Sequence, residues 1–477
     1  MFIHTNSIMG QSLFHLSALF FAVYFNVADS QQRYSLETRY TDMPVTHYEW
    51  QKQMETFKLR YLVNNKYHVR GGPIFVYLGG RGDINVYSQN TGFLFEIAAK
   101  FGALIAFIEH RYYGESLPFG NESLVIDNLR YLTTTEVLAD FVQTIDVVKR
   151  EALENLVSFD RHPVIAFGGG YSGSLAAWLR MKYPFLVLGA IASSAPMIYS
   201  SSVTNCECFN DVVTRTFEKY GQEQCVKTVK LGWEIIVNLS RSKLGLDFIS
   251  STWKLCKRMS SAEDVEKLLN WLNNIYVKLA LNNYHYPSDF FMPLPAYPLK
   301  VFCDKLTSSF FNDTKGLVEY FGQALQVYTN YSGKSVCNSL EEPTDYLLKY
   351  QECTELVMPK CSIDTDMFIN KPWVYENFAL ECHAKYGISG VKADWITLAY
   401  GGRNMKYASN IVFSHGEMDP YTCYGMRNNA SSTVWTFDIA DGSHHVDLRN
   451  PDVSDNNYIL TARRHHVQAI NTWLKLN

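Results

Sequence analysis

The first two hundred residues alternate between short apolar runs and longer amphipathic stretches. Amphipathic spacing over 93–101 and 135–155 predicts helices. The unbroken apolar runs between them are typical of strands buried on both faces of a sheet. This alternation predicts a mostly parallel sheet with helices on both faces, the α/β class. The expected strands are 38–40, 58–63, 73–78, 103–108, 164–167 and 186–195.

The segment 163–184 is the point around which this pattern is organised. Its apolar run Val164–Phe167 is followed by three glycines, Gly168 to Gly170, and then by good helix formers up to Lys182. A strand, a glycine-tight turn and a helix form the frame of the nucleophile elbow of α/β-hydrolases, where a serine stands on a sharp turn above the sheet. The turn has the small residues that an elbow needs, but glycine stands at its apex.

From about residue 200 to 375 the alternation of strands and helices stops, and it resumes afterwards. We therefore expect an α/β-hydrolase fold in two parts, 31–200 and 376–477, with a helical cap inserted over 201–375, a common way to roof a hydrolase pocket. The cap is predicted to contain helices at 209–220, 222–239, 262–281 and 315–327. The second part is predicted to contain strands at 411–414 and 433–439 and a closing helix at 456–476.

The elbow sequence F-G-G-G-Y-S-G-S-L-A-A-W resembles that of the lysosomal serine exopeptidases, the family of prolyl carboxypeptidase, dipeptidyl peptidase II and thymus-specific serine peptidase. Their pattern is G-G-S-Y-x-G-x-L-A-A-W, with the serine as nucleophile. Without a gap, that serine aligns with Gly170, while Tyr171 and Gly173 match the family. The segment Leu78-Gly79-Gly80 and Ser174 place the chain nearest the thymus-specific branch.

Ser172 is the alternative nucleophile, because Gly170-Tyr171-Ser172-Gly173-Ser174 is one residue short of G-x-S-x-G. If the helix begins at the apex, Ser172 lies roughly 200° around it from residue 170. Its hydroxyl would then point away from the catalytic histidine. We therefore interpret Ser172 as a small residue that lets helix and strand pack, and keep a shifted elbow as the competing hypothesis.

The loop that follows the strand 73–78 reads Gly79-Gly80-Arg81-Gly82. In hydrolases this loop supplies one oxyanion-hole N–H and the residue after the nucleophile supplies the other, so we expect Gly80, Arg81 and Tyr171 to form the hole. The family loop ends in G-x-E-G, so Arg81 reverses a charge beside the expected site. We interpret this reversal as relaxed catalytic constraint, with a neutral surface change as the alternative.

Two later motifs resemble those that carry the family's aspartate and histidine. His415 to Tyr421 resembles N-G-x-x-D-P-W, which assigns the orienting aspartate to Asp419. Gly442 to Arg449 resembles G-A-H-H-x-D-L-R, which assigns the general base to His444. The order of nucleophile position, aspartate and histidine is that of α/β-hydrolases.

The segment Glu109-His110-Arg111-Tyr112 resembles the family motif E-H-R-[YF]-Y-G-x-S. We expect it to be a charged, hydrogen-bonded loop at the carboxyl edge of the sheet that shapes the substrate pocket.

The amino terminus predicts export. Residues 13–27 form an apolar run too short for a comfortable membrane span, and Ala28-Asp29-Ser30 is a plausible cleavage site, so 1–30 is predicted to be a signal peptide. An uncleaved anchor is the alternative, since no lysine or arginine precedes the run. No later stretch of about 20 apolar residues follows, so we expect a soluble mature protein that is secreted or lysosomal.

All ten cysteines lie after position 205, without paired C-x-x-C spacing, and an exported chain favours disulfides. The resemblance implies the pairs Cys225–Cys303, Cys256–Cys337 and Cys353–Cys382, and a pair of Cys361 with Cys206 or Cys208. Cys423, and whichever of Cys206 and Cys208 does not pair with Cys361, stay unassigned. Sequons that suit the same compartment start at Asn121, Asn238, Asn312, Asn330 and Asn429.

A net charge of −4 gives no basic footprint for nucleic acid. We expect no cofactor and no metal, expect a peptide ligand, with peptides that contain proline among the candidates, and leave a homodimer open. The resemblance implies a serine-type exopeptidase acting beside proline, but Gly170 predicts an inactive or impaired homologue that binds peptides or a partner. The alternatives are an active exopeptidase that uses Ser172 and an esterase or lipase on the same fold.

Overall fold

The computed structural model describes residues 33–50, 55–152, 162–201, 205–307, 313–341 and 344–475. It divides into a unit 1–34 and a compact unit 35–477, and the second unit contains every helix and strand given below. The predicted signal peptide, residues 1–30, and the sequon asparagine Asn312 lie outside the described residues.

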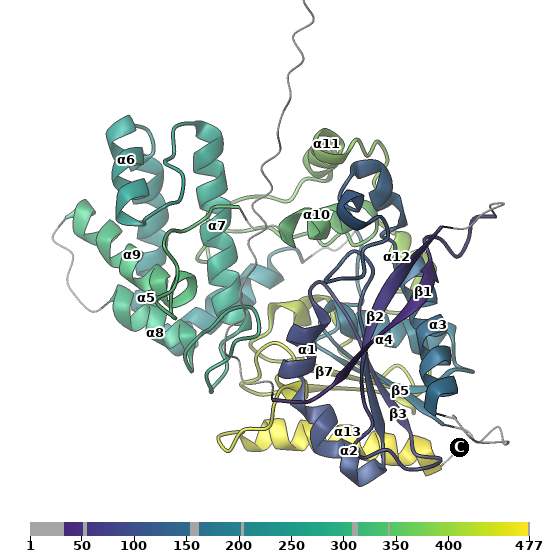
Figure 1. Cartoon of the computed structure of the whole chain (residues 1–477). Coiled ribbons are helices and arrows are strands. Elements are labelled where there is room, and N and C mark those ends of the chain that lie inside the picture. Colours follow the sequence, from purple (N-terminus) through teal and green to yellow (C-terminus); the bar gives the residue numbers. More distant parts are fainter. Residues whose placement is uncertain are drawn as a thin grey trace, which may run out of the picture. The chain divides into compact units, whose positions relative to one another are not determined.

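An eight-stranded sheet forms the centre of this unit, in the order β1-β2-β4-β3-β5-β6-β7-β8 (Figure 1). The strands β1 and β2 pair antiparallel, as do β2 and β4, and all other neighbours are parallel. The predicted mostly parallel sheet is therefore confirmed. The strands are β1 (Glu37–Pro44), β2 (Thr56–Asn64), β3 (Ile74–Leu78), β4 (Leu104–Ile108), β5 (Val164–Gly169), β6 (Val187–Ser193), β7 (Ile411–Gly416) and β8 (Val434–Ile439).

Helices cover both faces of the sheet, which explains why the central strands are apolar throughout. Successive side chains of a strand point to opposite faces, and Val76 and Phe75 of β3 accordingly belong to different clusters of the core. Val76 packs with α3 (Thr134–Ala152) and α4 (Tyr171–Lys182). Phe75 packs with α1 (Ile84–Asn90), α2 (Gly92–Phe101) and α13 (Asn457–Lys475).

Between β6 and β7 the chain forms a helical insertion with its own apolar core (teal to green in Figure 1). The longest helix, α5 (Cys208–Leu239), is interrupted at Gln222, whose φ of 62° is non-helical. The two helices predicted on either side of residue 221 are therefore continuous but kinked there. The other helices of the insertion core are α6 (Lys243–Thr252), α7 (Ala262–Leu281), α8 (Pro298–Leu306) and α9 (Thr314–Thr329).

Three more helices, α10 (Thr344–Thr354), α11 (Tyr375–Tyr386) and α12 (Trp395–Tyr400), complete the stretch before β7. They differ from α5–α9 because buried side chains of theirs, such as Tyr350 and Tyr400, join the core that lies against α3 and α4. The sequence did not predict these helices. Their contacts with the sheet-side core fasten the end of the insertion to the sheet.

Five disulfides join all ten cysteines, and they confirm every pair that the resemblance implied. The partner of Cys361, which the sequence analysis left open, is Cys206, and the remaining pair is Cys208–Cys423. The pair Cys208–Cys423 connects the start of α5 to the loop after β7, so it ties the insertion to the sheet body. The other disulfides are Cys225–Cys303, Cys256–Cys337 and Cys353–Cys382.

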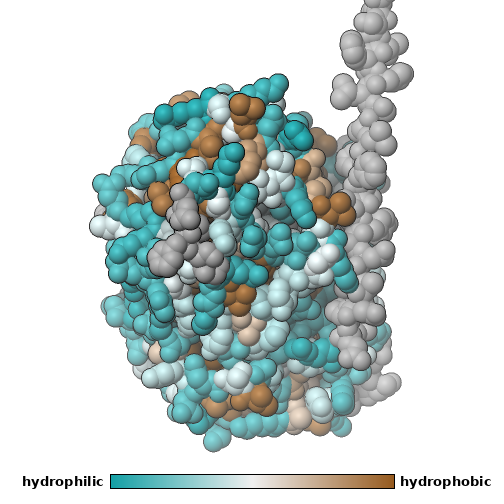
Figure 2. Space-filling model, turned by 90° about the vertical axis from the view of Figure 1, so that its left-hand side faces the viewer, coloured by the Kyte–Doolittle hydropathy of each residue, from teal (hydrophilic) through white to brown (hydrophobic). Residues whose placement is uncertain are grey.

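On the face shown in Figure 2, hydrophilic residues predominate and apolar residues lie in small separate groups. Within the described residues, no helix has the length and apolar character needed to cross a membrane. The sequon asparagines Asn121, Asn238 and Asn429 are exposed and Asn330 is half-buried, so the side chains of the first three are open to solvent.

Glu355, just after α10, joins this part of the chain to the start of α3. Its carboxyl group accepts hydrogen bonds from the backbone N–H of Thr134 at 2.8 Å and from the Thr134 hydroxyl at 3.3 Å. A carboxylate is favoured at a helix amino terminus, but Glu355 is only 5% exposed. Burial raises the pKa of Glu355 from 4.5 to about 7, against the opposing effect of the Thr134 hydrogen bonds.

A pH-dependent stability follows from Glu355. Because its pKa is higher in the folded than in the unfolded protein, its contribution is fully present below pH 4.5 and is lost as the pH rises toward 7. We expect the unfolding free energy of the natural protein, relative to that of Glu355→Gln, to fall by up to about 3 kcal/mol across this window. Thermal unfolding of both proteins from pH 4 to 8 measures this difference, and parallel curves would contradict it.

Candidate active site

The elbow predicted around residue 170 is present. At its apex, between β5 and α4, Gly170 has φ 63° and ψ −129°, a conformation that non-glycine residues adopt only under strain. The start of α4 packs closely on β5. A Cβ on Gly168 would lie only 2.1 Å from the carbonyl oxygen of Ser172, so only glycine fits there. The glycines therefore serve the backbone geometry of a strand–turn–helix elbow.

Asp419 and His444 form a buried pair beside the elbow. Asp419 follows β7 and starts a short 3₁₀ helix, Pro420–Tyr424, whose Tyr421 backbone N–H donates to Asp419 Oδ1 at 3.0 Å. The other carboxylate oxygen, Oδ2, lies 2.8 Å from His444 Nδ1. Asp419 is fully buried and His444 is 7% exposed. A carboxylate on Nδ1 favours the tautomer that carries its proton there, which leaves Nε2 free to accept one.

The elbow apex directly faces this nitrogen. A Cβ built on Gly170 would lie 2.9 Å from His444 Nε2 and 3.1 Å from Cε1. The structure therefore brings together the three positions that the sequence analysis assigned to nucleophile, aspartate and histidine. In the natural chain the nucleophile position has no side chain.

Ser172 also lines the cavity that contains Gly170 and His444, but its hydroxyl group has a different neighbour. Its hydroxyl oxygen is buried without a hydrogen-bond partner among the residues that the structure describes, and it lies 2.4 Å from where a Cβ on Gly80 would stand. It therefore faces the loop after β3. Within the described residues no hydrogen bond joins Ser172 to His444. The orientation agrees with the expectation that the helix turns this hydroxyl away from the histidine.

The loop after β3 lies along the same wall. Gly80, Arg81 and Tyr171 all line the cavity that contains Gly170 and His444. Tyr171 is the first residue of α4, and the first N–H groups of a helix have no intrahelical acceptor. The arrangement is compatible with an oxyanion hole, whose donors remain a prediction.

Glu109, His110, Arg111 and Tyr112 are not among the described residues that line the cavity, and their expected role in shaping the substrate pocket stays a prediction. They are buried behind its wall, where water cannot solvate charge, so the charged members are paired. Glu109 accepts from Arg60 Nη2 at 2.6 Å. Arg111 donates to both carboxylate oxygens of Asp140 at 2.6 Å.

His110 connects this buried layer to the cavity wall. Burial lowers the pKa of His110 to about 4, so the imidazole is neutral at physiological pH. Its Nε2 lies 3.4 Å from the hydroxyl of Tyr171, which lines the cavity. The motif therefore supports the wall from behind.

Gln351 of α10 joins several cavity residues, and the sequence analysis did not find this role. Its Oε1 accepts from Arg81 Nε at 3.0 Å and from the Tyr113 hydroxyl at 3.1 Å. Its Nε2 donates to the Tyr171 hydroxyl at 3.2 Å. These partners lie far from Gln351 in the chain, so no pattern in the sequence around Gln351 indicates the contacts.

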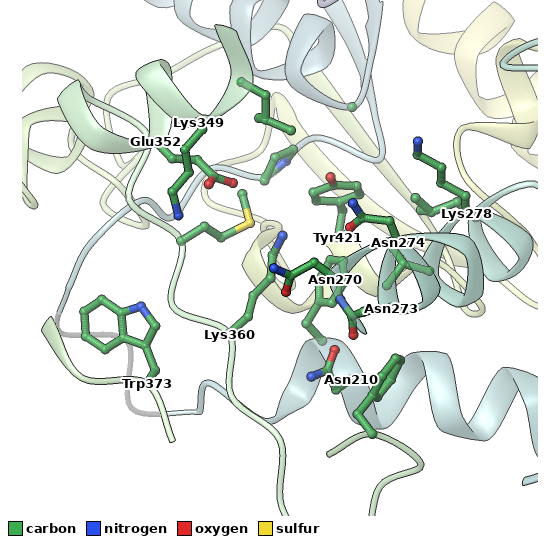
Figure 3. A pocket seen from close by; sticks show the side chains of 18 of the residues that line it. Asn210, Asn270, Asn273, Asn274, Lys278, Lys349, Glu352, Lys360, Trp373 and Tyr421 are labelled. Carbon is green, nitrogen blue, oxygen red and sulfur yellow. The ribbon is translucent and has the colours of Figure 1, made fainter. Parts of the chain in front are cut away.

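The cavity has a volume of about 770 Å³ and lies between the insertion and the carboxyl edge of the sheet. The wall on the insertion side is rich in amide and charged groups. Figure 3 shows Asn270, Asn273 and Asn274 projecting from α7, with Lys349 and Glu352 of α10 to their left. Tyr421 packs against the His444 ring, with centroids 5.3 Å apart, and thereby connects this wall to the Asp419–His444 pair.

One group of possible metal ligands occurs among the described residues, Cys206, Glu207 and Cys361. Both sulfurs are already joined to each other in a disulfide, so this group does not provide a metal site.

Comparison with known proteins gives the family. The family model described as "Serine carboxypeptidase S28" matches residues 45–466. The chain is 38% identical to lysosomal Pro-X carboxypeptidase of Homo sapiens over 91% of this chain and 88% of that protein. It is 29% identical to the thymus-specific serine protease of Homo sapiens, over 88% of this chain and 84% of that protein. The higher identity to the Pro-X carboxypeptidase corrects the expected closeness to the thymus-specific branch.

Among solved structures, an epoxide hydrolase from Vigna radiata is similar at 12% identity and a TM-score of 0.39, over 93% of this chain and 99% of that chain. The assignment rests on the family model and on the relatives that match nearly the whole chain. The chain belongs to the serine carboxypeptidase S28 family, and its strand order and helical insertion are those of an α/β-hydrolase fold.

Proposed function

We propose that this chain is a catalytically impaired member of its peptidase family that binds peptides in the cavity under the insertion. The observation that carries the proposal is Gly170, which stands where a nucleophile would face His444 Nε2. An acyl-enzyme requires a covalent bond from a side-chain oxygen to the scissile carbonyl carbon, and glycine has no such oxygen.

The remaining parts of the site support limited chemistry. The Asp419–His444 pair can hold or move a proton at Nε2. In serine proteases, loss of one triad member leaves only a residual catalysis of ~10³–10⁴-fold over water. We therefore expect peptide turnover far below that of an intact site.

Peptides are the ligands that the cavity fits best. Side-chain amides, such as those of Asn270 and Asn273, can both donate to and accept from a peptide backbone. Apolar side chains of the same wall, such as Leu269, Phe290 and Trp373, can pack against the side chains of a peptide. Relatives carry the names Pro-X carboxypeptidase and lysosomal, so peptides containing proline are the first candidates.

A secretory or lysosomal location is part of the proposal. Five disulfides form readily only where the environment is oxidising, and the related carboxypeptidases are named lysosomal. The predicted signal peptide at 1–30 would provide the route.

The first test is active-site labelling with a fluorophosphonate, which reacts with an activated serine. We expect no labelling of the natural protein and clear labelling of Gly170→Ser, because the new hydroxyl would lie beside His444 Nε2 after a shift of the ring by a few tenths of an ångström. Peptidase activity of Gly170→Ser is expected to exceed that of the natural protein by ~10³-fold or more.

The matched control is Gly170→Ser combined with His444→Ala, which keeps the serine and removes its base. We expect this double variant not to be labelled. Labelling of the natural protein that Ser172→Ala abolishes would show instead that the nucleophile has moved to Ser172, and the proposal would fail.

Ser172 gives a second, independent prediction through stability. A buried hydroxyl without a partner costs about 1–3 kcal/mol in lost hydration, and Ser172 Oγ is such a group. We expect Ser172→Ala to raise the free energy of unfolding by about 1 kcal/mol. Ser174→Ala is the comparison, since that hydroxyl donates to the Pro196 carbonyl at 2.6 Å and its loss should destabilise. Urea unfolding of the natural protein, Ser172→Ala and Ser174→Ala measures whether each substitution raises or lowers the free energy of unfolding.

A further inference from the structure

Arg81 places a guanidinium group in the wall of the cavity without a protein anion to balance it. Among the described residues no carboxylate lies within 4.0 Å of it, whereas the buried Arg60, Arg111 and Arg463 each contact one. Arg180 and Arg449 are also buried without a carboxylate within 4.0 Å among the described residues, but neither lines the cavity. A cation held partly out of water is normally paired, so the unpaired charge of Arg81 points to an anion that the protein does not itself contain.

The guanidinium is held in a defined orientation by neutral groups. Its Nε donates to Gln351 Oε1, and its Cζ lies 4.6 Å from the centre of the Tyr171 ring. Gln351 is itself fixed by the hydroxyls of Tyr113 and Tyr171. Within the described chain, neither terminal nitrogen of Arg81 has a hydrogen-bond acceptor. Two adjacent N–H groups in one plane match the two oxygens of a carboxylate.

Other features that favour an anion lie along the same wall. Tyr171, against which Arg81 stacks, is the first residue of the twelve-residue helix α4, and the amino end of a helix favours negative charge. The preceding Gly170 lies against the His444 ring, since a Cβ on it would be 2.9 Å from Nε2. Gly170, Tyr171, Arg81 and His444 line one cavity.

We propose that Arg81 binds the carboxylate at the C-terminus of a peptide, in the cavity that Gly170 and His444 also line. The inference rests on the proposed peptide binding and names its ligand class. A serine would attack an internal carbonyl group of a bound peptide. Here the site binds the C-terminal carboxylate of the peptide instead. The ligand is then a peptide with a free C-terminus, which the cavity retains without cleavage.

The test compares two peptides, Gly-Ala-Phe-Pro with a free carboxylate and the same peptide with a C-terminal amide, by calorimetric titration of the full-length natural protein. We expect the acid to bind on the order of 10- to 100-fold more tightly, the range that a charge-assisted hydrogen-bonded pair supplies. In Arg81→Gln this preference should fall to near one.

Lys371→Gln is the matched control, since it removes one positive charge from an exposed residue of the same cavity, and it should keep the preference. Equal binding of acid and amide by the natural protein would overturn the carboxylate inference and leave peptide binding standing. No binding of either peptide would overturn both. Displacement of the acid by millimolar inorganic phosphate but not by acetate would show a phosphate site, and would also overturn the assignment to a peptide end.

Discussion

The close approach of strand β5, helix α4 and the His444 loop is the constraint on which the site depends. The elbow at Gly170 exists because β5 ends beside β6 and α4 folds back over the sheet with almost no room between them. His444 reaches this point because the Asp419 carboxylate, at the end of β7, holds its Nδ1. Parallel strands end at one edge of a sheet, so segments more than 200 residues apart meet there.

The insertion turns this edge into an enclosed cavity. Its core is separate from that of the sheet body, but disulfides and buried polar contacts connect the two. Cys208–Cys423 ties α5 to the loop that carries Asp419, and Gln351 and Glu355 connect α10 to the elbow and to α3. The same contacts that fasten the insertion therefore also orient Tyr171 and Arg81, so ligand binding and attachment of the insertion share their residues.

The proposed loss of the nucleophile at Gly170 and the proposed role of Arg81 have a common physical meaning. A site that cleaves peptides needs a nucleophile and a hole for a transient oxyanion. A site with Gly170 and an unpaired arginine lacks the first and offers a permanent anion site instead. Seen in this way, Arg81 need not reflect relaxed constraint, because Gln351, Tyr113 and Tyr171 hold it in a definite position.

The sequence by itself determined the sheet, the elbow at Gly170 and the insertion, because apolar runs and glycines are local properties of a chain, and it led to Asp419 and His444 through the family resemblance. It also led to the disulfides through the family resemblance. Only the tertiary structure decided that Glu109 to Tyr112 lie behind the cavity, that Cys208 pairs with Cys423, and that Gln351 holds Arg81. These three facts depend on which side chains, far apart in the sequence, come into contact in the fold. Local sequence patterns do not specify such contacts or the burial of the side chains that make them.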